Sequence, residues 1–219
     1  VSADRQTLRF EIIRTDSLKL AYGGTSGQPI SAQFTELPLF HESGEPNNTL
    51  VAAYCALHAR TVNVTDAYTE EGFDFSGTRR FDQVTGYRSQ SFLTVPMKNH
   101  EGEVIGVLQL INAIDTPGGQ VVPFSPADQR LAESLASQAA VALSNRQLVA
   151  QLETLFESFI KLINLAIDEK SPYTGGHCQR VPALTMMLAD AVSATRSGPL
   201  ADFVMTDKDR YELKIAGLL

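Results

Sequence analysis

The longest stretch free of proline and glycine begins after Pro126 and ends before Pro172. Ser125 can cap a free backbone N–H, Pro126 suits the first helical position, and Asp128 lies near the positive end of the helix dipole. These signals predict one helix over residues 125–169. At 1.5 Å per residue its length is roughly 65 Å, far more than that of an ordinary domain helix.

Apolar residues recur along this helix at alternating spacings of four and three, the heptad pattern of a coiled coil. The first row is Leu148, Leu152, Leu155, Phe159, Leu162 and Ala166. A second row beside it is Val149, Phe156, Ile160, Ile163 and Ile167. One helix cannot bury so wide a stripe, so the pattern predicts a parallel homodimer through helix 125–170 that carries a signal along its axis. The alternative is a helix packed on the domains of its own chain.

Composition limits the partners and the compartment. The chain has 219 residues, a formal net charge of −7 and a pI of about 5.1, which argues against nucleic acid or anionic lipid as a partner. It contains no run of 18 apolar residues, so no membrane span is expected. Cys55 and Cys178 fit no metal or disulfide spacing and are expected to be small core or helix residues. A reducing cytoplasm is the expected location.

The rest of the chain alternates short strands with loops. Apolar runs and alternation predict strands at residues 8–12, 18–22, 37–40, 61–64, 91–97 and 104–112. A short helix is expected over residues 49–60, and a hairpin turn at Asn99–Gly102 joins the last two strands. The run from Val104 to Leu108 is apolar on both faces, which predicts a strand in the middle of the sheet. Residues 69–85 are polar and are expected to form a loop.

Four segments together resemble a GAF domain. They are Asn63-Val64-Thr65-Asp66-Ala67-Tyr68, Phe81-Asp82-Gln83-Val84-Thr85-Gly86-Tyr87-Arg88-Ser89-Gln90-Ser91, Val95-Pro96-Met97, and Gly102 through Asn112. The resemblance is to the branch found in cyclic-nucleotide phosphodiesterases and adenylate cyclases, and it covers about residues 1–145. It implies an α+β fold in which helices cover one face of a central antiparallel sheet. A small-molecule pocket would lie under loops on the other face.

That branch carries a dispersed Asn-Lys-Phe-Asp-Glu motif associated with cyclic-nucleotide binding. The resemblance makes Asp82 its aspartate and Phe73 or Phe75 its phenylalanine, whereas Gln83 stands at the glutamate. No lysine matches, so Arg79 or Arg80 is the expected partner of Asp82.

A ligand, with a cyclic nucleotide as the candidate, is therefore expected near the loop over residues 63–82. The expected ligand-binding residues are Asn63, Asp66, Phe73, Phe75, Phe81, Asp82, Ser91 and Thr94. The aromatic rings would stack on a base, and Asp82 or Ser91 would hydrogen-bond it. The alternative is that the three rings only pin the loop to the core.

The segment Ser171-Pro172-Tyr173-Thr174-Gly175-Gly176-His177, with Arg180-Val181 after it, resembles the opening of an HD-GYP domain. This is the bacterial module that hydrolyses cyclic di-GMP. The resemblance implies that His177 is a metal ligand. It also implies that the helix beginning at Tyr211 would continue into the His-Asp pair that names the family. The chain ends at Leu219, where that pair should begin.

A two-metal site, with Fe or Mn, needs several His and Asp ligands. The complete parent is therefore expected to be a metal-dependent phosphodiesterase, and this fragment is expected to have no catalytic residues and no activity. The segment after Tyr173 is expected to be disordered or packed on a neighbouring chain. Its apolar residues Leu184, Met187, Leu188 and Phe203 would otherwise lack cover.

The parts expected are a GAF sensor domain at residues 1–124, a connecting helix at 125–170 and an HD-GYP fragment at 171–219. The first function hypothesis is a sensor that binds a small molecule and signals through a dimeric helix to a cyclic di-GMP phosphodiesterase domain. The second is a GAF module that only dimerises and has no ligand. A catalytic fragment is the third, and the missing metal ligands argue against it.

Overall fold

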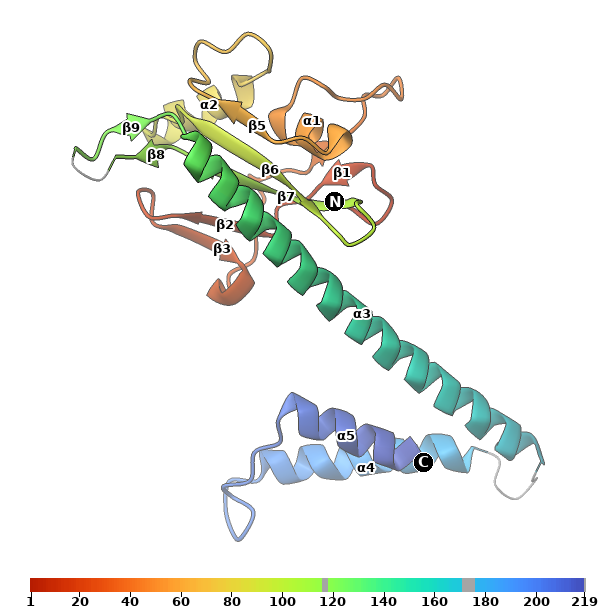
Figure 1. Cartoon of the computed structure of the whole chain (residues 1–219). Helices are drawn as coiled ribbons and strands as arrows, with labels where there is room; N and C mark the ends of the chain where they lie inside the picture. Colours follow the sequence, from red (N-terminus) through yellow and green to blue (C-terminus); the bar gives the residue numbers. More distant parts are fainter. Residues whose placement is uncertain (116–117, 171–175, 219) are drawn as a thin grey trace. The chain divides into compact units, whose positions relative to one another are not determined.

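The structure, a computed structural model, describes residues 1–115, 118–170 and 176–218. It contains two compact units, Val1–Asn145 and Arg146–Leu219. Helix α3 (Pro126–Lys170) belongs to both, since its first part packs in the first unit and the rest in the second (Figure 1). The fold is a mixed helix and sheet structure of the expected α+β class, and the expected long helix is confirmed. At its start, the Ser125 backbone N–H donates to Asp128 at 2.8 Å and the Asp128 N–H donates to Ser125 Oγ at 3.2 Å.

The first unit is built on an antiparallel sheet of β5 (Val62–Val64), β6 (Phe92–Lys98) and β7 (Val104–Ile111), with β6 in the middle. The hairpin between β6 and β7 is confirmed, because the Asn99 N–H donates to the Glu103 carbonyl at 2.9 Å and the Gly102 N–H to the Asn99 carbonyl at 3.0 Å. Gly102 has a φ of 81°, which glycine adopts without strain.

The central position expected for Val104–Leu108 is wrong. Within the described residues β7 pairs with β6 alone, so it is an edge strand of this sheet. It is nevertheless covered on both faces, because Val107 packs with Leu39 and Ala53 while Leu108 packs with the cluster on α3. The apolar run therefore correctly indicated that both faces of this strand are packed against other elements. Burial of both faces does not determine how many strands pair with it.

Short paired strands surround this sheet. They are β1 (Thr7–Leu8) with β4 (Leu37–Pro38), β2 (Ile12–Thr15) with β3 (Leu20–Gly23), and β8 (Ala113–Ile114) with β9 (Val121–Val122). A 3-10 turn, η1 (Gly24–Ser26), follows β3. The single strand expected over residues 8–12 is thus two strands, β1 and β2, which pair with different partners.

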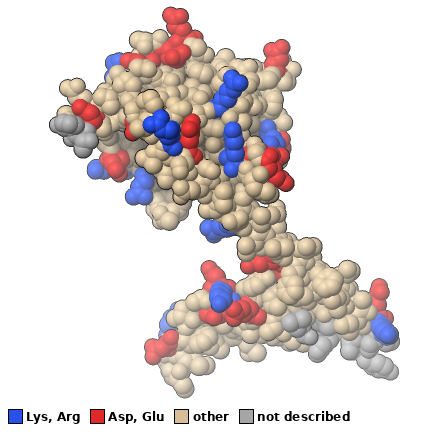
Figure 2. Space-filling model, in the orientation of Figure 1, with Lys and Arg blue, Asp and Glu red and all other residues tan. Residues whose placement is uncertain are grey.

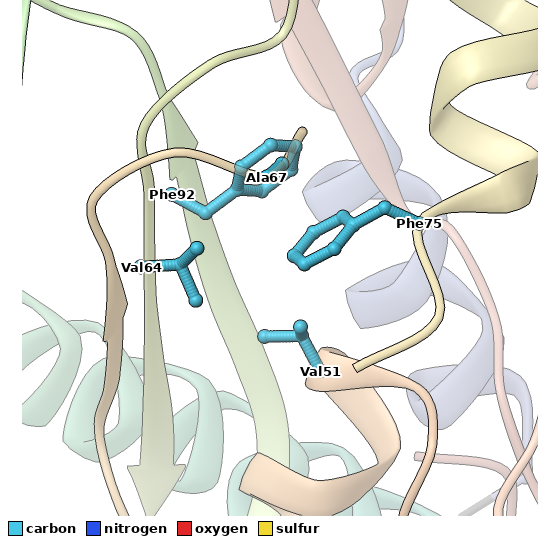
Figure 3. Packing of buried hydrophobic residues seen from close by; sticks show 5 residues of the cluster. All are labelled: Val51, Val64, Ala67, Phe75 and Phe92. Atoms are coloured by element: carbon cyan, nitrogen blue, oxygen red, sulfur yellow. The ribbon is translucent and has the colours of Figure 1, made fainter. Parts of the chain in front are cut away.

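The two faces of β6 are buried against different helices. Leu93 and Val95 pack on Ala132 and Ala136 of α3, small residues four apart that let the helix approach closely. On the other face lies α1 (Val51–His58). There Phe92 packs with a cluster whose members point toward one another in Figure 3: Val51, Val64, Ala67 and Phe75. Cys55 of α1 is fully buried, as expected.

The loop expected over residues 69–85 is half wrong, because Ser76–Thr85 forms helix α2. Asp74 accepts from the Ser76 N–H at 2.8 Å at its start, and Gly86 ends it with a φ of 70°. The buried residue of this helix is an aspartate, Asp82, rather than an apolar residue. A helix whose inward face is polar carries no apolar period, which is why the pattern missed it.

The second unit consists of the last part of α3 with α4 (His177–Ala194) and α5 (Asp207–Leu218). Helices α4 and α5 pack on each other, and Arg210 pairs with Asp190 between them. The expected disorder is therefore wrong for residues 176–218. The four apolar side chains expected to lack cover are exposed: Leu184, Met187, Leu188 and Phe203.

Helix α5 is also joined to α3. Lys214 Nζ lies 2.6 Å from Glu157 Oε2, and Asn164 Nδ2 donates to the Leu218 carbonyl at 2.7 Å. Ile160, on the same side of α3 as Glu157 and Asn164, is buried. These contacts occupy one side of α3 in this unit.

Candidate functional site

Asp82 is a buried carboxylate of the first unit that makes three hydrogen bonds. It projects from α2 and is only 4% exposed. Its Oδ2 accepts from Tyr68 Oη at 2.7 Å and from the Ser89 N–H at 2.7 Å, and its Oδ1 accepts from Ser89 Oγ at 2.8 Å. A buried carboxylate with three donors is well satisfied. These bonds hold α2 to the chain before it, at Tyr68, and to the chain after it, at Ser89.

The expected pairing of Asp82 with Arg79 or Arg80 is wrong. No arginine or lysine of the described residues forms an ion pair with it. Arg79 instead donates to the Ala67 carbonyl at 3.3 Å and lies 5.8 Å from the centre of the Tyr68 ring. The Arg88 guanidinium lies over the same ring at 4.4 Å. The hydrogen bond to Asp82, followed by partial burial and the charge of Asp82, raises the pKa of Tyr68.

The three expected aromatic residues lie in different places. Phe75 is buried against Phe92, with the ring centres 5.0 Å apart. Phe73 is half-buried and meets the ring of Tyr54 edge-on at 5.4 Å. Phe81, also half-buried, stacks on Phe34 at 6.0 Å, and Phe34 in turn contacts Phe10 and Tyr22.

Ser91 and Thr94 are fully buried and serve the sheet. Ser91 Oγ donates to the Val122 carbonyl at 2.8 Å and accepts from the Ala113 N–H at 3.2 Å, which holds β8 and β9 to the start of β6. Thr94 Oγ1 accepts from Gln109 Nε2 at 3.1 Å. Both polar groups are thus already paired within the protein.

Asn63 and Asp66 lie apart from these two. Asn63 stands opposite Leu93, whose side chain faces α3, and its Nδ2 donates to the Phe124 carbonyl at 3.1 Å. It is therefore on the face opposite Thr94. Asp66 is half-buried and accepts from the Tyr68 N–H at 2.8 Å, forming a local turn.

Hollows on the first unit do not coincide with the expected ligand residues. Two open surface depressions have volumes of about 550 Å³ and about 300 Å³. The larger is lined by β1 and the chain around His41, and the smaller by Val1, Leu57, Gly102 and their neighbours. Neither contains any of the eight expected residues. Figure 2 shows acidic and basic side chains interspersed on the face it presents.

Sequence reasoning missed four partners of the expected residues. Tyr68 and Ser89 bind Asp82, Phe34 packs on Phe81, and Gln109 binds Thr94. The hairpin register gave a usable signal for Gln109, since it places this exposed residue directly opposite Thr94. Nothing in the local pattern indicates that Phe34, far earlier in the chain, reaches Phe81.

The described residues contain no group of three or more His, Cys, Asp or Glu side chains arranged to hold a metal ion. The side chains of His177 and Cys178 lie outside the description, so the metal ligand expected at His177 is not tested. None of the helices in the described ranges combines the length and apolarity that a membrane span requires.

The fold and these residues define a GAF domain. The GAF domain family model matches residues 8–143, more than half of the chain, and the chain belongs to this family. A dual 3',5'-cyclic-AMP and -GMP phosphodiesterase 11A from Takifugu rubripes is 30% identical over 148 residues, 65% of this chain and 15% of that protein. A dual 3',5'-cyclic-AMP and -GMP phosphodiesterase 11 from Drosophila melanogaster is 30% identical over 181 residues, 75% of this chain and 12% of that protein.

The chain therefore spans less than a sixth of either relative. Among solved structures, the GAF domain from an Acinetobacter phosphoenolpyruvate-protein phosphotransferase aligns with a TM-score of 0.39 at 19% identity. That alignment covers 64% of this chain and 72% of the other. Family membership follows from the sequence matches.

Proposed function

We propose that this chain is the sensory part of a larger signalling protein, in which a GAF domain binds a small molecule and signals through α3. One observation carries the proposal. The family match ends at residue 143, inside a helix that continues to Lys170. Helix α3 thus runs without interruption from the proposed sensor domain into the second unit, and its first part packs directly on β6. A displacement of the sheet would act directly on the first part of this helix.

A cyclic nucleotide is the proposed class of ligand. The support is the similarity to two proteins named as cyclic-AMP and -GMP phosphodiesterases. Phe73 and Phe81 are half-buried and keep ring surface on which a base could stack, as expected of them. Phe75, Asp82, Ser91 and Thr94 are buried and paired, so in this proposal they shape the binding region from behind. Asp66 would act at its edge, whereas Asn63, which faces α3, would act only through the segment that enters that helix.

A GAF module without a ligand is the second candidate, and a specific observation favours it. Phe81 packs on Phe34, which also contacts Phe10 and Tyr22, so aromatic rings fill this region themselves. Among the described residues, Ser193 Oγ is the one buried side-chain polar atom without a hydrogen-bond partner, and it lies in the second unit. No buried side-chain polar atom described in the first unit is left unpaired for a ligand to satisfy.

Dimerisation through α3 is part of the proposal. In the second unit one side of α3, with Ile160, is covered by the chain itself. The heptad row on another side is open, and its large residues are 47–66% exposed: Leu148, Leu152, Leu155, Phe159 and Leu162. A second copy of the same helix, aligned in parallel, would bury this row. The large open apolar row is thus the support for a homodimer.

We further propose that residues 1–124 sense, residues 125–170 transmit, and residues 171–219 begin a bacterial HD-GYP phosphodiesterase domain. In the complete enzyme His177 would be one ligand of a divalent metal pair that activates water to attack cyclic di-GMP. The support is the sequence resemblance around His177. The free, buried thiol of Cys55 agrees with a cytoplasmic location.

A thermal-shift titration with cyclic AMP, cyclic GMP and cyclic di-GMP tests the ligand. A nucleotide at 100 times its dissociation constant should add about 2.7 kcal/mol, or several degrees in melting temperature. Phe81→Ala should weaken the shift, whereas Phe203→Ala, which removes a ring in the second unit, should leave it unchanged. No saturable shift with any of the three would contradict the ligand and support the module that only dimerises.

A further inference from the structure

We propose that Asn145 fixes the parallel, in-register alignment of two α3 helices. The inference rests on the dimer proposed above and adds what determines its orientation. Its starting point is the position of this residue in the heptad pattern. Residues seven apart on α3 form one column: Leu131, Gln138, Asn145, Leu152, Phe159 and Ala166.

This column is the centre of the apolar stripe. From Leu131 to Phe159, the residues three places after the members of the column are Ser134, Val141, Leu148, Leu155 and Leu162. Those four places after are Leu135, Ala142, Val149, Phe156 and Ile163, and the charged Glu169 and Lys170 follow Ala166 at the end of the helix. Both flanking rows are mostly apolar. Asn145 therefore occupies a core position whichever flanking row joins the column in the interface.

The amide of Asn145 has no hydrogen-bond partner among the residues that the structure describes, and it is exposed. Some other amides of the helix are paired within the chain, whereas those of the exposed Gln147 and Gln151, like that of Asn145, have no partner among the described residues. Asn164 donates to the Leu218 carbonyl at 2.7 Å, and Gln138 donates to Ser134 Oγ at 3.4 Å. If a second helix covers the stripe, Asn145 is removed from water and needs a partner there. In a parallel pair in register, the partner is Asn145 of the second copy.

Charge supports a second copy of this helix as the occupant. No charged residue lies in the column or in its two flanking rows from Leu131 to Ala166. All the charges of this stretch point elsewhere: Glu133, Arg146, Glu153, Glu157 and Lys161. Two identical helices can therefore approach along this stripe without bringing like charges together.

A pair of asparagines at one core position selects among alignments. Shifting one helix by a heptad places one Asn145 amide against Leu152 and the other against Gln138, and reversing one helix sets Asn145 against a flanking row. In each case the two Asn145 amides are separated, and at least one loses its amide partner. The in-register parallel pair alone joins the two amides. Asn145 thus makes the pair of α3 helices less stable than an apolar residue at this position would, but it excludes competing alignments.

The test uses chains with Cys178→Ser and a reporter, Leu152→Cys, in the same column. A disulfide between two copies requires Cα atoms about 4.4–6.8 Å apart, which a parallel pair in register provides and an antiparallel or staggered pair does not. Disulfide yield and mass by light scattering are compared for Asn145, Asn145→Leu and the matched control Gln147→Leu. Gln147 is exposed and lies on the opposite side of the helix from Asn145.

With Asn145 and with the control, we expect a dimeric mass and a high yield of the disulfide. With Asn145→Leu, the yield should fall to about half as antiparallel pairs form, or the mass should rise above that of a dimer. A yield and mass equal to those of the control would overturn the role of Asn145 while leaving the dimer in place. A monomeric mass for the unmodified chain would refute the dimer itself.

Discussion

Replacing Asp82 with alanine should destabilise the first unit by removing the acceptor of three hydrogen bonds. Two of the donors are the backbone N–H and hydroxyl of Ser89, which is only 3% exposed. Water cannot readily replace the lost carboxylate there. The third donor is the hydroxyl of Tyr68, which is half-exposed and can turn to solvent.

The magnitude follows from these exposures. A buried donor left without an acceptor costs about 1–3 kcal/mol, and the Ser89 hydroxyl can recover part of this by rotating. Asp82→Ala should therefore lower the free energy of unfolding by about 2–4 kcal/mol. Tyr68→Phe deletes one bond and leaves Asp82 with both Ser89 donors, so its cost should be about 0.5–1.5 kcal/mol.

Urea unfolding measures both effects. With a slope of about 2 kcal/mol per molar urea, the midpoint for Asp82→Ala should fall by about 1–2 M. Asp16→Ala is the matched control, because Asp16 is exposed and lies in a turn, and its midpoint should stay near that of the unmodified chain. If Asp82→Ala behaves like Asp16→Ala, or costs less than Tyr68→Phe, Asp82 does not hold α2 in place.

Two further predictions concern buried side chains. Burial raises the pKa of the Cys55 thiol to about 12. In a Cys178→Ser chain at pH 8, Cys55 should therefore resist a thiol reagent until urea unfolds the protein, and rapid labelling of the native chain would contradict this. The unfolded thiol loses its proton first, so the free energy of unfolding should fall as the pH rises from about 9 toward 12. Ala136→Leu should cost about 1–3 kcal/mol, because Ala136 is fully buried between α3 and β6. The control Ala139→Leu, at an exposed position of the same helix, should change the urea midpoint little. Equal effects of the two substitutions would show that α3 does not pack on β6 at Ala136.

The sequence predicted the elements that depend on local signals. The long helix has a capping pair at Ser125 and Asp128 and contains no breaker, and the β6–β7 hairpin has its turn at Asn99–Gly102. Such signals lie within a few residues of the structure they produce. Helix α2 had no such local signal, because its buried residue is Asp82. The burial of Asp82 depends on hydrogen bonds to Tyr68 and Ser89 rather than on hydrophobicity.

The candidate site was less predictable because its partners come from distant segments. Phe34 reaches Phe81 from another part of the chain, and Asn63 turns toward α3 because its register sets it opposite Leu93. The family resemblance singled out Asp82, but the arginine partner expected for it is wrong. A phenol replaces the expected cation, and this choice depends on the course of the loop that carries Tyr68.

Hydrogen bonds and short stretches of chain connect Asp82 of α2 to the start of α3. It binds Ser89, two residues before Ser91, and Ser91 Oγ donates to the Val122 carbonyl ahead of the helix. Phe124, two residues further on, has its carbonyl held by Asn63 of β5. Four of the eight residues expected to bind ligand thus lie on this route. Phe81 and Asp82 belong to α2, and Ser91 and Asn63 hydrogen-bond the segment that leads into α3. A ligand that moved α2 would reach this segment through these hydrogen bonds, and it would couple to α3 if it bound two states of the segment with different affinity.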